Sequence, residues 1–248
     1  MDSLNLERYQ FVFVGGILGE MLKLNFVASY FEDSKKILQS LGAQETYIYQ
    51  PNSLYAAQEN SHQLVSFLNR LYKTNQKKIV LICHSKGCLE ALASLARYPA
   101  IMDRVIQKVF CVQPPFKGSA LTEFYAQTYK IGSRFWPGLR SLGRDCAQEI
   151  LSELSDNQKK MMEEKLVIVK GAKPEKIAWI LKVSHKKLAK RGVVSDGLLS
   201  LDDQELSGFN LTQLTIPMDH SDLFTSKVIT RASMQFKTQV LENLMQMI

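Results

Sequence analysis

Residues 78–97, KIVLICHSKGCLEALASLAR, form the stretch that decides the fold of this chain. KIVLIC (78–83) is an apolar run typical of a buried strand, and residues 86–97 have the apolar spacing of a helix. Ser85 and Gly87 lie in the turn between them. Serine and glycine are ordinary turn residues, but a strand, a serine and a helix in direct succession also form the strained elbow that exposes a nucleophile.

The same alternation of short apolar runs with helical patterns extends along most of the chain. Gly42 closes the first predicted helix in the left-handed conformation, and Ser61 is the predicted N-cap of the second. Strands that are apolar on both faces and separated by helices predict a parallel sheet covered on both sides. The other predicted strands cover residues 11–16, 46–51, 108–115, 165–171 and 210–218, and the other predicted helices cover residues 24–42, 61–74, 181–192 and 226–247. We therefore expect one α/β domain over residues 1–248, with a mostly parallel, doubly wound sheet.

The regular alternation breaks between the fourth and fifth predicted strands. Residues 119–164 carry helical patterns without a strand, and they are rich in large aromatic side chains. We expect a helical insertion at about 119–164, in which the aromatic side chains either pack as its own core or line a substrate pocket: Phe124, Tyr125, Phe135 and Trp136.

Composition narrows the classes of protein and partner. With 46% hydrophobic and 22% charged residues, the chain is of ordinary globular type. No apolar run reaches the ~18 residues of a membrane span and no signal peptide is visible, so we expect a cytoplasmic protein. Its four cysteines are isolated, which favours reduced core thiols over disulfides: Cys83, Cys88, Cys111 and Cys146.

The net charge of +7 is concentrated in the basic run LKVSHKKLAKRG (181–192). A solvated helix face is one interpretation of this run. Peripheral contact with an anionic lipid surface is the functional alternative, because basic patches attract such surfaces. Nucleic acid is not predicted as a partner, since no aromatic residues alternate with the charges and no binding motif is present.

A serine at an elbow needs a base to take its proton and an acid to orient that base. Of the four histidines, only His220 follows a late predicted strand, in IPMDHSDLF (216–224), where a loop at the carboxyl edge of the sheet is expected. His84 adjoins Ser85, and we expect its side chain to point away from the hydroxyl. For the acid, VVSDGLLS (193–200) places Asp196 in a turn after an extended run, with Asp202 and Asp203 as alternatives.

The oxyanion of an acyl-transfer intermediate needs two backbone N–H donors. One is expected from Lys86, the residue after the serine, and the other from Ile17 in the loop VGGILGE (14–20). The glycines of that loop also fit an ordinary turn. They lack the lysine and the spacing that phosphate-binding loops need.

Taken together, these motifs resemble those of the bacterial triacylglycerol lipases and esterases of the α/β-hydrolase superfamily. The family's oxyanion, elbow, acid and base motifs are matched in order by VGGIL (14–18), CHSKG (83–87), SDGLLS (195–200) and MDHSDL (218–223). Two positions depart from the family: Gly15 replaces its histidine, and Cys83 replaces its first elbow glycine. A fifth motif, QPPFKGSALTEF (113–124), lies between the elbow and the acid loop.

The resemblance implies an α/β-hydrolase fold with residues 119–164 as a lid, and a serine hydrolase that cleaves small-molecule or lipid esters without a cofactor. It assigns Ser85, Asp196 and His220 as the triad. In some relatives the aspartate two residues after the histidine binds calcium, but Asp222 has no clear partner, so a surface aspartate or helix N-cap is expected and no metal is predicted. An acyltransferase or thioesterase with the same triad, or a non-catalytic hydrolase-like binding protein, stays open.

Overall fold

In the computed structural model, residues 5–17, 30–119, 142–143, 146–226 and 229–248 are described. Within these ranges the chain forms a single sheet of six strands in the order β2-β1-β3-β4-β5-β6. Every neighbouring pair of strands is parallel. The strands are β1 (Gln10–Val14), β2 (Glu45–Tyr49), β3 (Ile79–His84), β4 (Ile106–Val112), β5 (Leu166–Gly171) and β6 (Thr212–Ile216).

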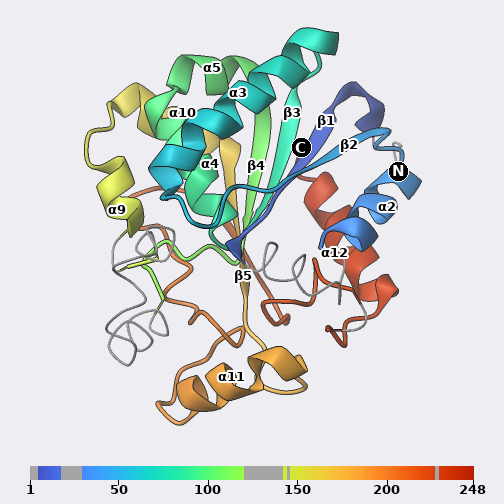
Figure 1. The fold of residues 1–248 in the computed structure, drawn as a ribbon, viewed down its shortest axis with the longest axis vertical. Helices are drawn as coiled ribbons and strands as arrows, with labels where there is room; N and C mark the ends of the chain where they lie inside the picture. Colours follow the sequence, from blue (N-terminus) through green and yellow to red (C-terminus); the bar gives the residue numbers. More distant parts are fainter. Residues whose placement is uncertain (1–4, 18–29, 120–141, 144–145, 227–228) are drawn as a thin grey trace.

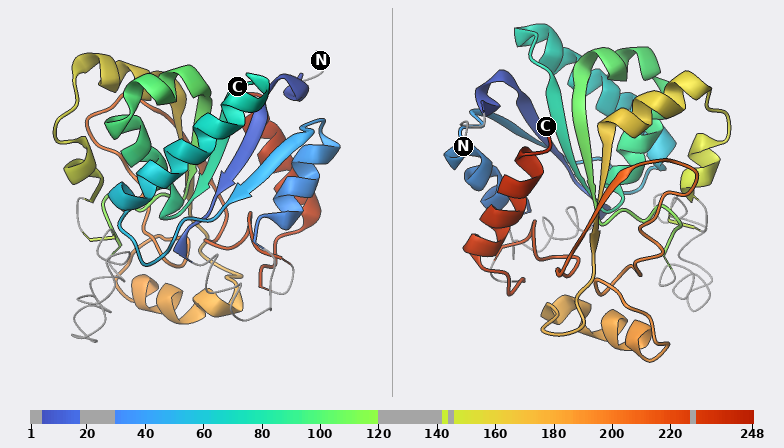
Figure 2. Two further views of the ribbon diagram at one scale, coloured as in Figure 1. Left: turned by 45° about the horizontal axis from the view of Figure 1, so that its top comes forward. Right: turned by 180° about the vertical axis from the view of Figure 1, so that it is seen from behind.

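Helices cover both faces of the sheet (Figures 1 and 2). One face carries α3 (Ala57–Asn75), α4 (Gly87–Arg97), α5 (Pro99–Val105), α9 (Cys146–Leu151) and α10 (Asp156–Lys165). The opposite face carries α2 (Glu32–Ser40) and α12 (Met234–Met245). The remaining elements are η1 (Leu6–Arg8), η2 (Trp179–Leu181) and α11 (Lys182–Ala189).

Successive side chains of each central strand enter opposite cores. In β1, Val12 and Val14 pack beneath α3 and α4, whereas Phe11 and Phe13 pack beneath α2 and α12. All four are fully buried. A parallel strand covered on both faces must be apolar at every position, which explains the uninterrupted apolar runs in the sequence.

The bounds of three predicted helices differ from the structure. The helix predicted over 24–42 is not continuous, because Tyr30 forms a β-bridge to Thr225 and Phe31 adopts a left-handed φ of 67°. α2 begins only at Glu32, and the predicted start at residue 24 lies outside the described residues. α3 begins at Ala57, so Ser61 lies inside the helix and hydrogen-bonds Gln58 O instead of capping. α12 starts only at Met234, where the Ser233 hydroxyl accepts from Phe236 N.

Other local predictions are confirmed by the coordinates. Gly42 has a φ of 101° directly after α2, in the left-handed region that glycine adopts without steric cost. All four cysteines are buried and free.

The predicted insertion divides into two parts. Phe124, Tyr125, Phe135 and Trp136 lie outside the described residues, so the lid role of this segment stays a prediction. Its C-terminal part forms α9, which packs on α4, and α10, which packs on β4 and α4. Residues 146–165 thus belong to the helical layer over the sheet.

The carboxyl ends of the strands share one edge of the sheet. Val14, His84 and Val112 end the three central strands there. α11 lies beyond the same edge, away from both helical layers (Figure 1). Within the described ranges no helix is both long enough and apolar enough to cross a membrane.

Candidate active site at the carboxyl edge of the sheet

Ser85 occupies a tight turn between β3 and α4. Its φ is +54°, a conformation that is strained for a residue with a Cβ. Its N–H donates to Val112 O at 3.0 Å, and its carbonyl accepts from Cys88 N at 3.0 Å. Gly87 is required at the start of α4, since a Cβ there would lie 2.5 Å from Val14 O. Backbone strain held on both sides in this way is the geometry of a nucleophile elbow.

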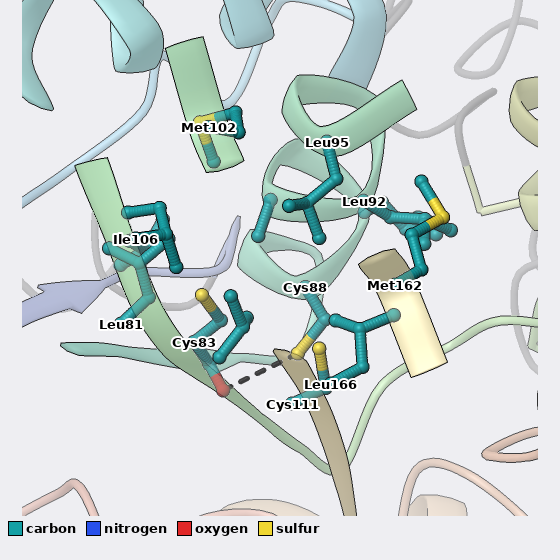
Figure 3. Packing of buried hydrophobic residues seen from close by; sticks show 14 of the residues in the cluster. Leu81, Cys83, Cys88, Leu92, Leu95, Met102, Ile106, Cys111, Met162 and Leu166 are labelled. Atoms are coloured by element: carbon teal, nitrogen blue, oxygen red, sulfur yellow. Dashed lines mark hydrogen bonds between the residues drawn. The ribbon is translucent and has the colours of Figure 1, made fainter. Parts of the chain in front are cut away.

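Cys83, which departs from the usual elbow glycine, is accommodated by a sulfur-rich core beneath the turn (Figure 3). It packs with Cys88 and Cys111 among leucine side chains, and Cys88 Sγ donates to Cys83 O at 3.4 Å. Burial raises the pKa of the Cys83 and Cys88 thiols well above their ordinary value. These thiols are therefore neutral packing groups, and the serine is the nucleophile candidate at this turn.

The candidate base and acid are joined directly. His220 Nδ1 lies 2.7 Å from Asp196 Oδ2, and both side chains are buried. His220 N also donates to Asp196 O at 2.8 Å, which ties the two loops together. Because the carboxylate accepts from Nδ1–H, the imidazole keeps Nε2 free to take a proton.

Asp196 is itself fixed by its own turn. Its Oδ1 accepts from Leu198 N at 2.9 Å and from Leu199 N at 2.7 Å. The alternative acids are engaged elsewhere: Asp202 pairs with Lys117, and Asp203 accepts from Ser200 N. Of the three candidates, Asp196 is the one whose carboxylate binds His220.

The candidate base, His220, lies beside the elbow. The His220 ring centroid is 4.6 Å from that of His84, the residue before Ser85. Within the described residues no hydrogen bond joins Ser85 Oγ to His220. Catalytic hydrogen bonds are often long in proteins without substrate and tighten only when it binds.

A chain of hydrogen bonds that the sequence did not suggest runs behind the base. Gly16 N donates to Tyr30 Oη at 3.4 Å, and Tyr30 Oη hydrogen-bonds His84 Nδ1. His84 Nε2 lies 3.3 Å from Gln113 Oε1. Burial, with the neighbouring His220, lowers the pKa of His84 well below its ordinary value. His84 is thus a buried, neutral ring that donates from Nε2 and lies against the imidazole of His220.

The loop after β1 lies against the elbow. A Cβ on Gly16 would be 2.9 Å from Ser85 Cβ and 3.3 Å from Lys86 N. Gln50 Nε2 donates to Gly16 O at 3.0 Å and holds this loop from the β2 side. Ile17 follows directly, and within the described chain neither Ile17 N nor Lys86 N donates a hydrogen bond. This arrangement places the backbone that carries both predicted oxyanion donors next to the serine.

The Lys86 side chain points into the protein. It forms a buried ion pair with Glu90 one helical turn later, and the two side chains are 2% and 1% exposed. Asn60 Nδ2 donates to Glu90 Oε1 at 3.0 Å. Burial raises the pKa of Glu90, and the Lys86 charge opposes that rise. The spacing of four residues was the sequence signal that could have predicted this pair.

The loop that carries His220 is held by two further aspartates, Asp219 and Asp222. Asp222 accepts from Lys173 Nζ at 2.6 Å and from Asp219 N at 2.9 Å, and Asp219 accepts from Ala178 N at 2.8 Å. The expectation of a surface aspartate or helix N-cap at position 222 was wrong, because this side chain is buried and ion-paired. Among the described residues no group of three or more His, Cys, Asp or Glu is placed to hold a metal ion.

Comparison with solved structures shows the α/β-hydrolase fold. A metagenomic carboxyl esterase superposes with a TM-score of 0.72 at 20% identity, over 96% of this chain and 75% of the esterase. The mature lipase of Bacillus licheniformis superposes with a TM-score of 0.68 at 19% identity, over 95% of this chain and 91% of the lipase. The phospholipase PlaB of Legionella pneumophila gives a TM-score of 0.57 at 13% identity, over 79% of this chain and 45% of that chain. No protein-family model and no curated protein sequence matches the chain.

Proposed function

We propose that this α/β-hydrolase-fold protein is a serine hydrolase that cleaves carboxylic esters. The observation that carries the proposal is the carboxylate-bound His220 beside a serine held at a left-handed φ. The esterase and lipase activities of the structural neighbours agree with this chemistry. They favour small-molecule or lipid esters as the substrate class.

In this mechanism Ser85 Oγ attacks the ester carbonyl carbon while His220 Nε2 takes the hydroxyl proton. Asp196 holds the imidazole through Nδ1 and stabilises the imidazolium that forms. The N–H groups of Ile17 and Lys86 stabilise the negative charge that develops on the carbonyl oxygen. His220 then returns the proton to the leaving alkoxide, which departs as an alcohol. Water hydrolyses the acyl-enzyme by the same route.

The environment of His220 fits this role. When the imidazole takes the proton, a second cation nearby would oppose it. His84, the ring in contact with it, is kept neutral by burial. The positive charge of Lys86 is compensated by its buried ion pair with Glu90.

The test is hydrolysis of p-nitrophenyl esters from C2 to C16 by wild type, Ser85→Ala, His220→Ala and Asp196→Asn. Each variant is expected to lose ~10³-fold or more in kcat, because the triad acts as a unit. His62→Ala is the matched control, since His62 lies exposed on α3 and is expected to keep wild-type activity.

A fluorophosphonate probe provides an independent readout. It should label the wild type and the control but not Ser85→Ala. Absence of labelling and of turnover in folded wild-type protein would refute the hydrolase proposal and favour a binding protein. Ester turnover that survives in Ser85→Ala would refute the assignment of the nucleophile.

A further inference from the structure

The segment beyond the carboxyl edge of the sheet carries an unbalanced positive charge. Residues 176–191 contain six Lys or Arg residues and no Asp or Glu. Lys182, Lys186 and Lys190 are exposed. In the part of the chain that the structure describes, these three lysines form no ion pair, whereas Lys77, Lys117 and others elsewhere do.

Large apolar side chains are exposed among these charges. Trp179, Val183 and Val194 are 60%, 65% and 59% exposed. Val183 in α11 lies three residues before Lys186 and seven before the C-cap residue Lys190, whose backbone is still helical, so the three share one face. Solvation alone explains lysines on a surface, but it does not explain a tryptophan and two valines that are exposed in the same short stretch of chain.

The opposite side of this segment is firmly attached to the candidate active site. Ile177 and Leu181 pack in a small buried cluster, and a Cβ on Gly197 would lie 3.1 Å from Leu181 Cβ. Ala178 N donates to Asp219 Oδ2 at 2.8 Å. The segment therefore rests on both loops that hold Asp196 and His220.

We propose that residues 176–194, η2 and α11 included, form a docking surface for an anionic phospholipid membrane. Lysines attract anionic headgroups, and an exposed tryptophan with valines beside it enters the apolar boundary below them. A shallow hollow of about 420 Å³ beside the helix extends the positive surface, with Lys176, Lys182 and Arg231 in its lining together with Glu175. A nucleic acid would use the charges but leave the apolar side chains in water.

Docking in this way would bring the membrane to the edge of the sheet where the triad lies. If the protein is the proposed ester hydrolase, its substrates are then esters presented by a membrane. This consequence rests on the proposed function. Binding itself does not depend on Ser85. It can therefore be measured in Ser85→Ala, which removes turnover of vesicle lipids.

The experiment is co-sedimentation of full-length Ser85→Ala protein with vesicles of phosphatidylcholine, alone or with phosphatidylglycerol. The reversal Lys182→Glu/Lys186→Glu/Lys190→Glu is expected to lower binding to anionic vesicles by ~100-fold or more, since each cation near such a surface contributes a factor of about five. The matched control reverses three other exposed lysines and changes the net charge equally: Lys36, Lys73 and Lys160, each to Glu.

Loss of binding in the first triple variant but not in the control supports the proposal. Trp179→Phe should also remove the blue shift of tryptophan emission on binding. Equal losses of vesicle binding in both triple variants would show that the protein is attracted only by its overall positive charge, and would overturn the proposal. The proposal would also be overturned if the protein bound no vesicle at all. It would be overturned as well if the protein bound only heparin or RNA and its tryptophan emission did not shift. None of these outcomes depends on ester turnover, so each is distinguishable from failure of the proposed function.

Discussion

Gly16→Ala should impair catalysis through a single added methyl group. The new Cβ would lie 2.9 Å from Ser85 Cβ and 3.0 Å from His84 O, whereas ordinary contact begins at 3.4 Å. The loop after β1 and the elbow must therefore separate by about half an ångström, because neither neighbour is the flexible end of a side chain. The structural cost is overpacking of about 1–3 kcal/mol in the free energy of unfolding.

The catalytic cost follows from the position of the donors. A misplacement of about 1 Å in a catalytic group costs ~100-fold in rate, and loss of an oxyanion donor costs ~10²–10³-fold. For half that displacement we expect kcat for p-nitrophenyl esters to fall ~10–100-fold, with a smaller change in KM. Kinetics should be measured well below the melting temperature of the variant, so that the fraction of folded protein is constant.

Gly42→Ala is the control variant, because it should lower the stability of the fold without disturbing the candidate catalytic groups. Gly42 has open space around its Cβ position but a φ of 101°, so an alanine there is strained by about 1–2 kcal/mol. It should lower the melting temperature and leave kcat unchanged. If Gly16→Ala turned over esters at the wild-type rate, the loop after β1 would not be the source of an oxyanion donor, and the reasoning would be refuted.

Two further predictions concern buried titratable groups near the elbow. Lys86→Met leaves Glu90 buried without its partner and should cost about 3–5 kcal/mol in the free energy of unfolding, whereas Lys86→Met/Glu90→Gln should recover most of that loss. Denaturant titration of the single and double variants gives the coupling, and strictly additive costs would contradict the ion pair. The second prediction concerns His84, whose folded-state pKa lies well below its ordinary 6.5, so the unfolded chain binds a proton that the folded chain does not. The free energy of unfolding should thus fall as pH decreases below 6.5, by up to about 1.4 kcal/mol per pH unit. His84→Asn should remove this component, and identical pH slopes for both proteins would contradict it.

Local patterns were sufficient for the sheet and for the elbow. The central strands β1, β3, β4 and β5 are buried on both faces, so their positions are mostly apolar and the runs are visible without knowledge of their neighbours. Ser85 and Gly87 are constrained by the turn itself, since each has close backbone neighbours in β1 or β4. The predicted helix over 24–42 differs from the structure for the opposite reason. Tyr30 has helical spacing in the sequence, but it pairs with Thr225, nearly two hundred residues away.

The residue types of the candidate site and their order can be found from short motifs, because each motif is a short stretch with its own turn chemistry. Which side chains meet depends on the tertiary structure. It selected Asp196 over Asp202 and Asp203 as the partner of His220, placed His84 against that imidazole, and turned Lys86 inward toward Glu90. These contacts join segments that lie far apart in the chain or depend on which side of an element faces the core. Local propensity carries no information on either, since only the packing of the sheet and its loops brings such groups together.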